Sequence, residues 1–206
     1  MASRWVKSES LIENESAVSA KPGGPLRPRL EAVQRRIENQ IKRLDEAGRN
    51  LKAKDDDTYN KLMTSVKENN LQYSTVLSAD LSRSRQVSRV LAVAKLTLEK
   101  IYAKLASVSD FGDLVIVLSP TMAVVRNIKS LLAPHVPEME EDLGVTSELL
   151  SGILVDAGQA GGYTINFETA NEEAVRLIDE TSQAVEQKMR EEYSGIPDMS
   201  VISKVA

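Results

Sequence analysis

Apolar residues recur every three or four positions along most of this chain, which is the spacing of one face of an α-helix. The first such stripe follows Pro28 and continues to Leu51. The run Asp-Asp-Asp-Thr at residues 55–58 then interrupts it, and oxygens of this kind accept the free backbone N–H groups at a helix start. The pattern therefore predicts a first helix that ends near residue 54 and a second helix that begins near Thr58.

A seven-residue repeat of mainly apolar positions fills the predicted second helix, residues 59–108. Such a sustained repeat is typical of a coiled-coil seam, and about 50 helical residues would extend roughly 75 Å. We therefore expect the first two helices to form a long antiparallel hairpin. One row of the repeat reads Tyr59, Val66, Tyr73, Asp80, Val87, Ala94, Ile101 and Val108.

Proline and glycine divide the second half of the chain into shorter predicted helices. Phe111-Gly112-Asp113 interrupts the second helix, and Ser119-Pro120 predicts the start of a third, because serine caps a helix and proline suits its first turn. Pro134 and Pro137 then separate the third helix from a fourth, which is expected over residues 138–156.

The last predicted helix covers residues 171–193 and carries a weak apolar stripe of Val175, Ile178, Val185 and Met189. Aromatic residues make up 4 % of the chain, a composition that suits long helices more than sheets. We therefore predict an all-α fold, with a long helical hairpin followed by short helices. The predicted divisions are a flexible N-terminal tail at 1–26, a helical core at 27–157, a linker at 158–170, and an acidic C-terminal helix and tail at 171–206.

Charge is segregated along the chain, although the net charge is only −4. Residues 21–54 hold ten basic residues against four acidic ones, and residues 138–192 hold fourteen acidic residues against three basic ones. A split of this kind indicates a partner. The basic segment could meet phosphate or the acidic segment of its own chain. We hypothesise that the acidic segment folds back on the hairpin and keeps the monomer closed; the alternative is that its acidity serves solubility.

Candidate catalytic motifs do not combine into an active site. Asp110-Phe111-Gly112 spells the magnesium-binding triplet of protein kinases, but the glycine-rich loop, the strand lysine and the catalytic loop are missing. Cysteine is absent and His135 is the one histidine, which excludes thiol nucleophiles and multi-histidine metal sites. We expect no enzyme and no cofactor. We also expect no membrane-spanning helix, because no run approaches 18 apolar residues.

Residues 90–158 resemble the ESCRT-III family and, within it, the archaeal CdvB-like cell-division branch. The resemblance is carried by the Phe-Gly-Asp interruption, the proline-initiated third helix and the Pro-Glu start of the fourth helix. It extends over residues 27–158, where the first helix matches in its basic character. No winged-helix segment follows the last helix, so the chain resembles a short paralogue.

The resemblance implies a non-catalytic subunit that polymerises with itself and with paralogous ESCRT-III subunits in a membrane-scission machine. Its implied partners are an anionic membrane and an AAA-type ATPase that disassembles the polymer, and its implied place is the cytoplasmic membrane face at the division site. If the acidic segment keeps the monomer closed, deleting residues 159–206 should promote filaments. We expect no nucleic-acid partner, because aromatic residues for base stacking are few and the net charge is negative.

Two sets of residues are candidate sites. Basic residues on the first helix suit an anionic bilayer, and a tryptophan flanked by bases suits the headgroup region. The alternatives are a solvated helix face with local pairs such as Glu38 with Lys42, and an ordinary tail. The membrane candidates are Trp5, Arg27, Arg29, Arg35, Arg36, Lys42 and Arg43. A proline-containing tail that resembles the family's ATPase-docking motif supplies Ile196, Pro197 and Met199.

Two other protein classes share the hairpin plan. A soluble coiled-coil adaptor would dimerise through the repeat at 59–108 and would not contact lipid. A phage-shock-type membrane-stress protein has a similar hairpin but usually a longer amphipathic start. Salt-sensitive sedimentation with anionic vesicles would separate a membrane polymer from an adaptor.

Overall fold

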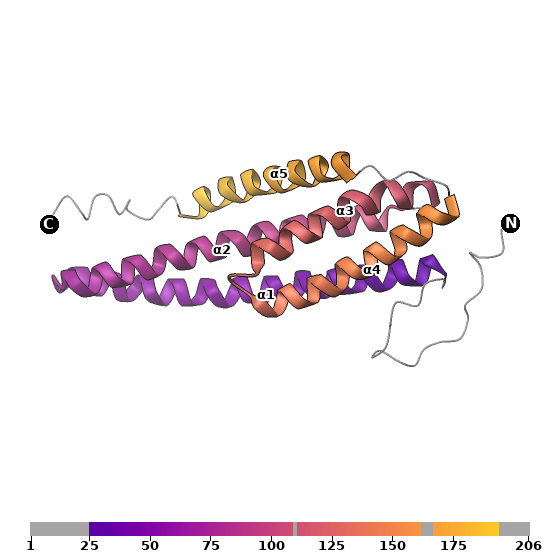
Figure 1. Ribbon diagram of the computed structural model, residues 1–206. Helices are drawn as coiled ribbons and strands as arrows, with labels where there is room; N and C mark the ends of the chain where they lie inside the picture. Colours follow the sequence, from indigo (N-terminus) through magenta and orange to yellow (C-terminus); the bar gives the residue numbers. More distant parts are fainter. Residues whose placement is uncertain (1–24, 109–110, 162–166, 194–206) are drawn as a thin grey trace, which may run out of the picture.

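The computed structural model describes residues 25–108, 111–161 and 167–193 of the 206-residue chain. These residues form five α-helices, and no strand occurs among them (Figure 1). The helices are α1 (Leu26–Lys67), α2 (Leu71–Ala106), α3 (Phe111–Leu132), α4 (Pro137–Gly161) and α5 (Phe167–Tyr193). The predicted all-α class, with a long hairpin followed by shorter helices, is confirmed.

The two longest helices, α1 and α2, form an antiparallel hairpin (Figure 1). Near its open end, Gln34 Nε2 donates a hydrogen bond of 2.9 Å to the Leu105 carbonyl oxygen. Near its closed end, the Ser65 and Ser74 hydroxyl oxygens lie 2.9 Å apart. The residue numbers add to 139 in both pairs, so one register holds along the whole hairpin.

The predicted break at residues 55–58 is wrong, because α1 continues through it to Lys67. Asp55 is buried at 4 % exposure, and Asp57 pairs with Lys61 one turn later at 2.6 Å. Aspartate is a weak helix former, but the apolar positions on both sides of this run pack against α2, and tertiary packing outweighs local propensity.

The hairpin turns instead at Glu68-Asn69-Asn70. Asn69 has a φ of 56°, in the left-handed region that asparagine tolerates better than most residues. Asn70 Oδ1 accepts a hydrogen bond of 3.2 Å from the Tyr73 backbone N–H and so caps α2. The predicted continuous repeat is therefore divided between two helices, and Tyr73, a predicted seam residue, is 48 % exposed.

The predicted helix start at Ser119-Pro120 is also wrong. The third helix already begins at Phe111 and holds Pro120 in its interior. A proline there cannot donate to the carbonyl oxygen four residues earlier. That carbonyl belongs to Ile116, which is 72 % exposed, so water can reach the turn that lacks its hydrogen bond.

The last two helices are longer than predicted. The fourth continues to Gly161 and the fifth begins at Phe167, so the predicted linker at 158–170 overlaps both of them. Ala157 and Ala170, on the two sides of this stretch, are buried. Their packing favours helix over an extended linker, a tertiary effect that the glycine-rich composition does not reveal.

One apolar core joins all five helices. Helices α3 and α4 form a second antiparallel pair, α4 also packs on α1, and α5 lies along α2 and α3 (Figure 1). The buried side of α5 includes Ala174, Thr181 and Val185. The predicted stripe residue Val175 is instead 48 % exposed, because it is turned about 100° around the helix from its buried neighbour Ala174.

The stretch Asp113–Leu132 of α3 is long and apolar enough to cross a membrane by length and composition. Half of it is buried inside the protein, against the neighbouring helices. The central helix of a helical bundle has the same composition, so packing in the core explains its apolar character.

Candidate functional site

The six basic residues predicted to face a membrane all lie on α1, where they form two stripes. Side chains seven positions apart lie on the same side of a helix. The clasped stripe, which lies beside α4, consists of Arg29, Arg36 and Arg43. The open stripe, which is exposed to solvent, consists of Arg27, Arg35, Lys42 and, beyond the prediction, Arg49.

Arg29 is held near the end of α4. Its Nη1 donates to Asp156 Oδ2, and the two side chains are 11 % and 21 % exposed. Gly152 makes room for the guanidinium, since a Cβ at that position would lie 2.8 Å from Arg29 Nη2. Hydrogen bonds between two charged groups are stronger than neutral ones, so this pair fixes α4 against the start of α1.

Further along α1, Arg43 Nη1 donates to Asp142 Oδ2, and its Nη2 lies 3.7 Å from Glu138 Oε2. Between the two arginines, Gln40 Nε2 donates a buried hydrogen bond of 2.9 Å to Thr146 Oγ1. The numbers of the hydrogen-bonded residues add to 185 or 186 in all three contacts, so α4 runs antiparallel to α1. Acidic residues of α4 therefore pair with two members of the clasped stripe, Arg29 and Arg43, and the Arg43 side chain stays 48 % exposed.

A shallow hollow of about 500 Å³ remains between α1 and α4. It is lined by Arg36, Asn39, Gln40, Lys42, Arg43 and Asp142. The Arg36 side chain borders this hollow and is half-buried, so a ligand anion could reach the clasped stripe here without displacing α4.

The open stripe is neutralised differently, because its acids lie on α1 itself. The pairs, each four positions apart, are Arg27 with Glu31, Lys42 with Glu38, and Arg49 with Asp45. Exposed pairs of this spacing contribute about 0.3–0.5 kcal/mol. In contrast, Arg29 and Arg36 have no acidic residue three or four positions away on α1.

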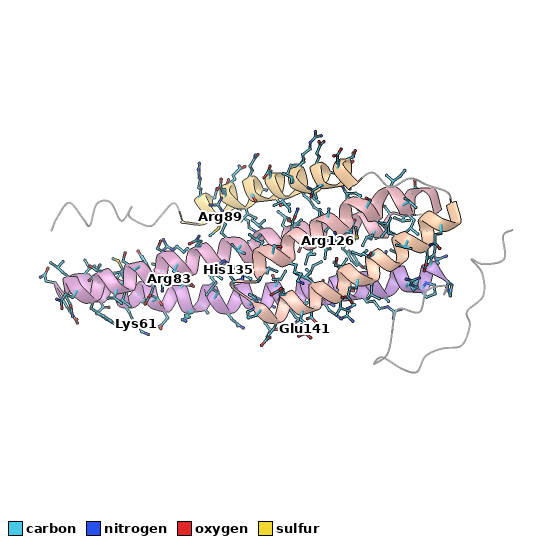
Figure 2. All side chains as sticks on the ribbon, in the orientation of Figure 1. Lys61, Arg83, Arg89, Arg126, His135 and Glu141 are labelled. Atoms are coloured by element: carbon cyan, nitrogen blue, oxygen red, sulfur yellow. The ribbon has the colours of Figure 1, made fainter. Side chains whose placement is uncertain are left out.

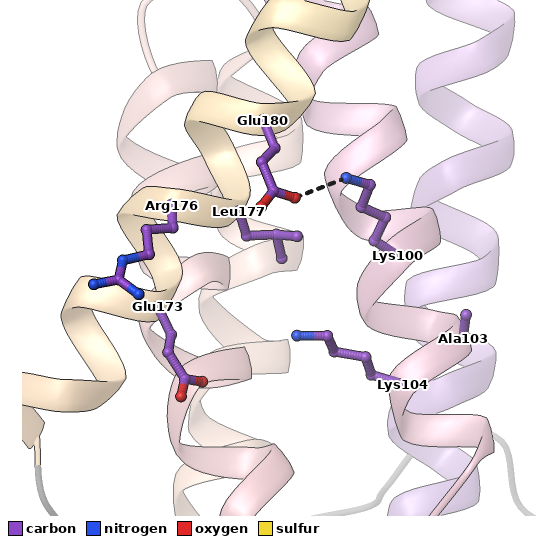
Figure 3. A pocket seen from close by; sticks show the side chains of 7 residues that line it. All are labelled: Lys100, Ala103, Lys104, Glu173, Arg176, Leu177 and Glu180. Atoms are coloured by element: carbon purple, nitrogen blue, oxygen red, sulfur yellow. Dashed lines mark hydrogen bonds and ion pairs between the residues drawn. The ribbon is translucent and has the colours of Figure 1, made fainter.

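Acidic residues of α5 pair with basic residues of α2, so these ion pairs join two helices, as those of the clasped stripe do. Arg89 Nη2 pairs with Glu186 Oε1, and Lys100 Nζ lies 3.4 Å from Glu180 Oε2 (Figure 3). A groove of about 520 Å³ lies between the two helices, with Lys104 reaching into it from α2 (Figure 3). The acidic segment thus lies on the hairpin as hypothesised, while its effect on assembly stays a prediction.

Lys95 on α2 pairs with Asp45, the acidic partner of the open-stripe residue Arg49. It donates to Asp45 Oδ1, and this hydrogen bond, with the lysine charge, holds the pKa of Asp45 below its ordinary value of 3.8. Sequence reasoning missed Lys95, Arg89 and Lys100 because it looked for basic residues within 21–54. Their position on the polar side of the seven-residue repeat could have indicated a surface for other helices.

Among the described residues, no group of three or more metal-ligating side chains occurs. His135 is exposed in the turn between α3 and α4, and Glu141 is exposed at the start of α4 (Figure 2). The neighbouring acid Glu140 lies 3.7 Å from Lys129 Nζ. The predicted sites Trp5, Ile196, Pro197 and Met199 lie outside the described residues and stay predictions.

Two curated proteins of Sulfolobus acidocaldarius are similar to this chain. Cell division protein B1 is 26 % identical over 184 residues, which cover 89 % of this chain and 86 % of the relative. Cell division protein B is 26 % identical over 162 residues, which cover 79 % of this chain and 62 % of the relative. These two relatives support the resemblance of this chain to the CdvB-like proteins of the ESCRT-III family.

The CdvB-like chain spans less than two thirds of the length of Cell division protein B. No family model matches it, and no solved structure matches it. Its fold, a long helical hairpin with shorter helices packed on one part of it (Figure 1), is the one that the ESCRT-III resemblance implied.

Proposed function

We propose that this CdvB-like chain is a non-catalytic membrane-remodelling subunit that acts in cell division. It polymerises with copies of itself and with related subunits on the cytoplasmic face of the membrane at the division site. An AAA-type ATPase takes the polymer apart, with Ile196, Pro197 and Met199 as the proposed docking residues. Similarity over most of the chain to two relatives named as cell division proteins supports this role most directly.

The structural observation that supports membrane binding is the spacing of the clasped stripe. Its three arginines lie on one line along about 21 Å of α1, and two of them lack acidic neighbours on their own helix. A base near an anionic bilayer contributes about 1 kcal/mol. Three bases engaged together would give reversible binding that salt weakens.

Cover by α4 suggests that the described arrangement is a closed form. While Asp142 and Asp156 pair with Arg43 and Arg29, two of the three arginines are neutralised by a helix that can in principle leave. We propose that the membrane-bound form has α4 displaced, and that Trp5 and the open-stripe residues Arg27, Arg35 and Lys42 then add further contacts.

Sedimentation of the full chain with vesicles tests this function. Anionic and neutral vesicles are compared at low and high salt, and the pellets are viewed by negative-stain microscopy. We expect binding to anionic vesicles alone, reduced by salt, with filaments or tubules in the pellet.

Variants of the clasped stripe sharpen the test. Arg36→Glu should weaken binding, because this arginine forms no ion pair with any residue that the structure describes, so its reversal should leave the fold intact. Lys188→Glu, on an exposed position of α5, is the matched control and should bind as the parent chain does. A soluble dimer that ignores both vesicle types would reject the proposal and favour the adaptor.

A further inference from the structure

A layer of buried polar side chains interrupts the contact between α1 and α2. Asp55 is 4 % exposed, and its Oδ2 has no hydrogen-bond partner. In the hairpin register Asp55 lies opposite Ser84. The hydroxyl oxygens of Ser84 and Ser88 are also buried without a hydrogen-bond partner among the described residues. Buried polar atoms are nearly always hydrogen-bonded in native proteins, so three exceptions in one layer mark an unusual place in the hairpin.

This polar layer separates two apolar clusters. On one side, Leu44 and Leu91 belong to the core that joins all five helices, which we call the body. On the other side, Leu62, Leu77 and Leu81 form a cluster of their own. We call this part of the hairpin, residues 56–83, the tip. The buried apolar side chains of the tip and those of the body therefore form two separate clusters.

Among the residues that the structure describes, the apolar cluster of the tip is formed by side chains of α1 and α2 alone. In Figure 1 the closed end of the hairpin extends beyond α3, α4 and α5. Along α2, the ion pair of Arg89 with Glu186 of α5 lies on the body side of Ser88. Most of the stability of a helix in a protein comes from tertiary packing, and the tip packs through a much smaller cluster than the body does.

We infer that the hairpin consists of two cooperative units, and that the tip opens locally while the body stays folded. The polar layer is the boundary between them, because opening up to it exposes the buried Asp55 carboxyl group and two buried serine hydroxyl oxygens to water. Opening separates α1 from α2 over the tip alone, and exposes Leu62, Leu77 and Leu81 together.

Amide hydrogen exchange on the full chain tests this inference without any variant. Peptides from both tip segments, residues 56–67 and 71–83, should exchange at similar rates, about tenfold or more faster than those from 30–44 and 91–105. Equal protection in tip and body would overturn the inference. So would a smooth gradient of protection from the turn inward, which is the pattern of end fraying.

Replacing the buried Asp55 side chain tests the role of the polar layer. Asp55→Leu should join the two clusters and slow tip exchange by about tenfold, toward the rate of the body. The control Asp56→Leu changes an exposed neighbour with the same gain in helix propensity. It should slow amide exchange in the tip much less than Asp55→Leu does. If Asp55→Leu does not fold, Asp55→Ala against Asp56→Ala makes the same comparison. Equal slowing by position-55 and position-56 variants would contradict the boundary role.

Discussion

The clasped and open stripes of α1 carry the same kind of charge on the same helix but are neutralised in different ways. The open stripe pairs with acids four residues away, which move with it. In the clasped stripe, Arg43 and Arg29 pair with acids of α4 that lie 99 and 127 residues later in the chain. Local neutralisation is permanent, whereas neutralisation by another helix can be reversed by a conformational change. A count of basic residues does not distinguish the two.

The largest expected effect comes from removing the acids that cover the clasped stripe. The triple variant Glu138→Gln, Asp142→Asn, Asp156→Asn should raise partitioning onto anionic vesicles by roughly 30-fold, because two freed arginines contribute about 1 kcal/mol each. Partition coefficients at low salt measure this. The variant Glu141→Gln, Glu148→Gln removes exposed acids of α4 and serves as control. A control that binds as tightly as the triple variant would show that only net charge matters.

The second effect is on stability. Arg29→Ala should lower the free energy of unfolding by about 2 kcal/mol, because Asp156 would lose its partner in a partly buried place. Arg27→Ala, in the open stripe, should change it by less than about 0.5 kcal/mol. Urea unfolding followed by circular dichroism compares the two. Equal losses would mean that the contact of α4 with Arg29 contributes nothing specific.

A smaller difference is expected in lipid affinity between single members of the two stripes. In the triple variant, Arg36→Ala should weaken vesicle binding about fivefold, the effect of about 1 kcal/mol. The neutralised pair Lys42→Gln, Glu38→Gln should change binding by less than about twofold, since it removes one charge of each sign. Vesicle titration of both variants provides the measurement, and a larger effect from the neutralised pair would place the membrane on the open stripe.

Two glycine variants test whether Arg29 of the clasped stripe needs the space that Gly152 leaves open. Gly152→Ala should lower the free energy of unfolding by about 1 kcal/mol, because its Cβ would push Arg29 away from Asp156. Loss of that pair costs about 2 kcal/mol, and the gain in helix propensity returns about 1 kcal/mol of it. Gly48→Ala adds a Cβ to open space in α1 and should stabilise the protein by about 0.5–1 kcal/mol through helix propensity. Thermal or urea unfolding will show whether each variant raises or lowers the free energy of unfolding. Stabilisation by both would mean that Arg29 adjusts without losing its pair.

The smallest effect concerns Asp45 beside the open stripe. Its pKa is lowered in the folded protein by Lys95, so its ionised form stabilises the fold above the ordinary carboxyl range. This contribution is lost as the pH falls through the lowered pKa. The stability difference between the parent chain and Asp45→Asn should therefore be present at pH 6 and vanish at pH 2. A difference that persists at pH 2 would assign the effect to something other than the charge.

Much of the fold was accessible from the sequence. The apolar spacing predicted the helices and the hairpin, and the charge split raised the hypothesis that the acidic segment folds back on the hairpin. The positions of the helix ends were less predictable. The aspartates at 55–57 are cap-forming residues in isolation, and Pro120 looks like a helix start, yet both lie inside helices. Local preferences of this kind amount to a fraction of the packing energy along a long apolar face.

The candidate site, like the fold, was predictable only in part. All six predicted bases lie on α1, where they divide between two stripes, and their role at a membrane stays a prediction. Lys42 forms the pair with Glu38 that the alternative, a solvated helix face, had named. Which bases are covered was not predictable, because the positions of α4 and α5 on the hairpin depend on contacts such as Gln40 with Thr146 and Thr97 with Thr181. No spacing within a single helix encodes such contacts between distant segments.

The sequence by itself determined that this protein is helical and that its basic and acidic residues are concentrated in different segments of the chain. These are properties of residue type and periodicity, which act over one or two helical turns. Tertiary structure alone decided where the hairpin turns, which arginines α4 neutralises, and where an unsatisfied aspartate lies between two clusters. Each of these depends on which distant side chains share a buried space, and packing free energy in that space overrides the preferences of the residues taken singly.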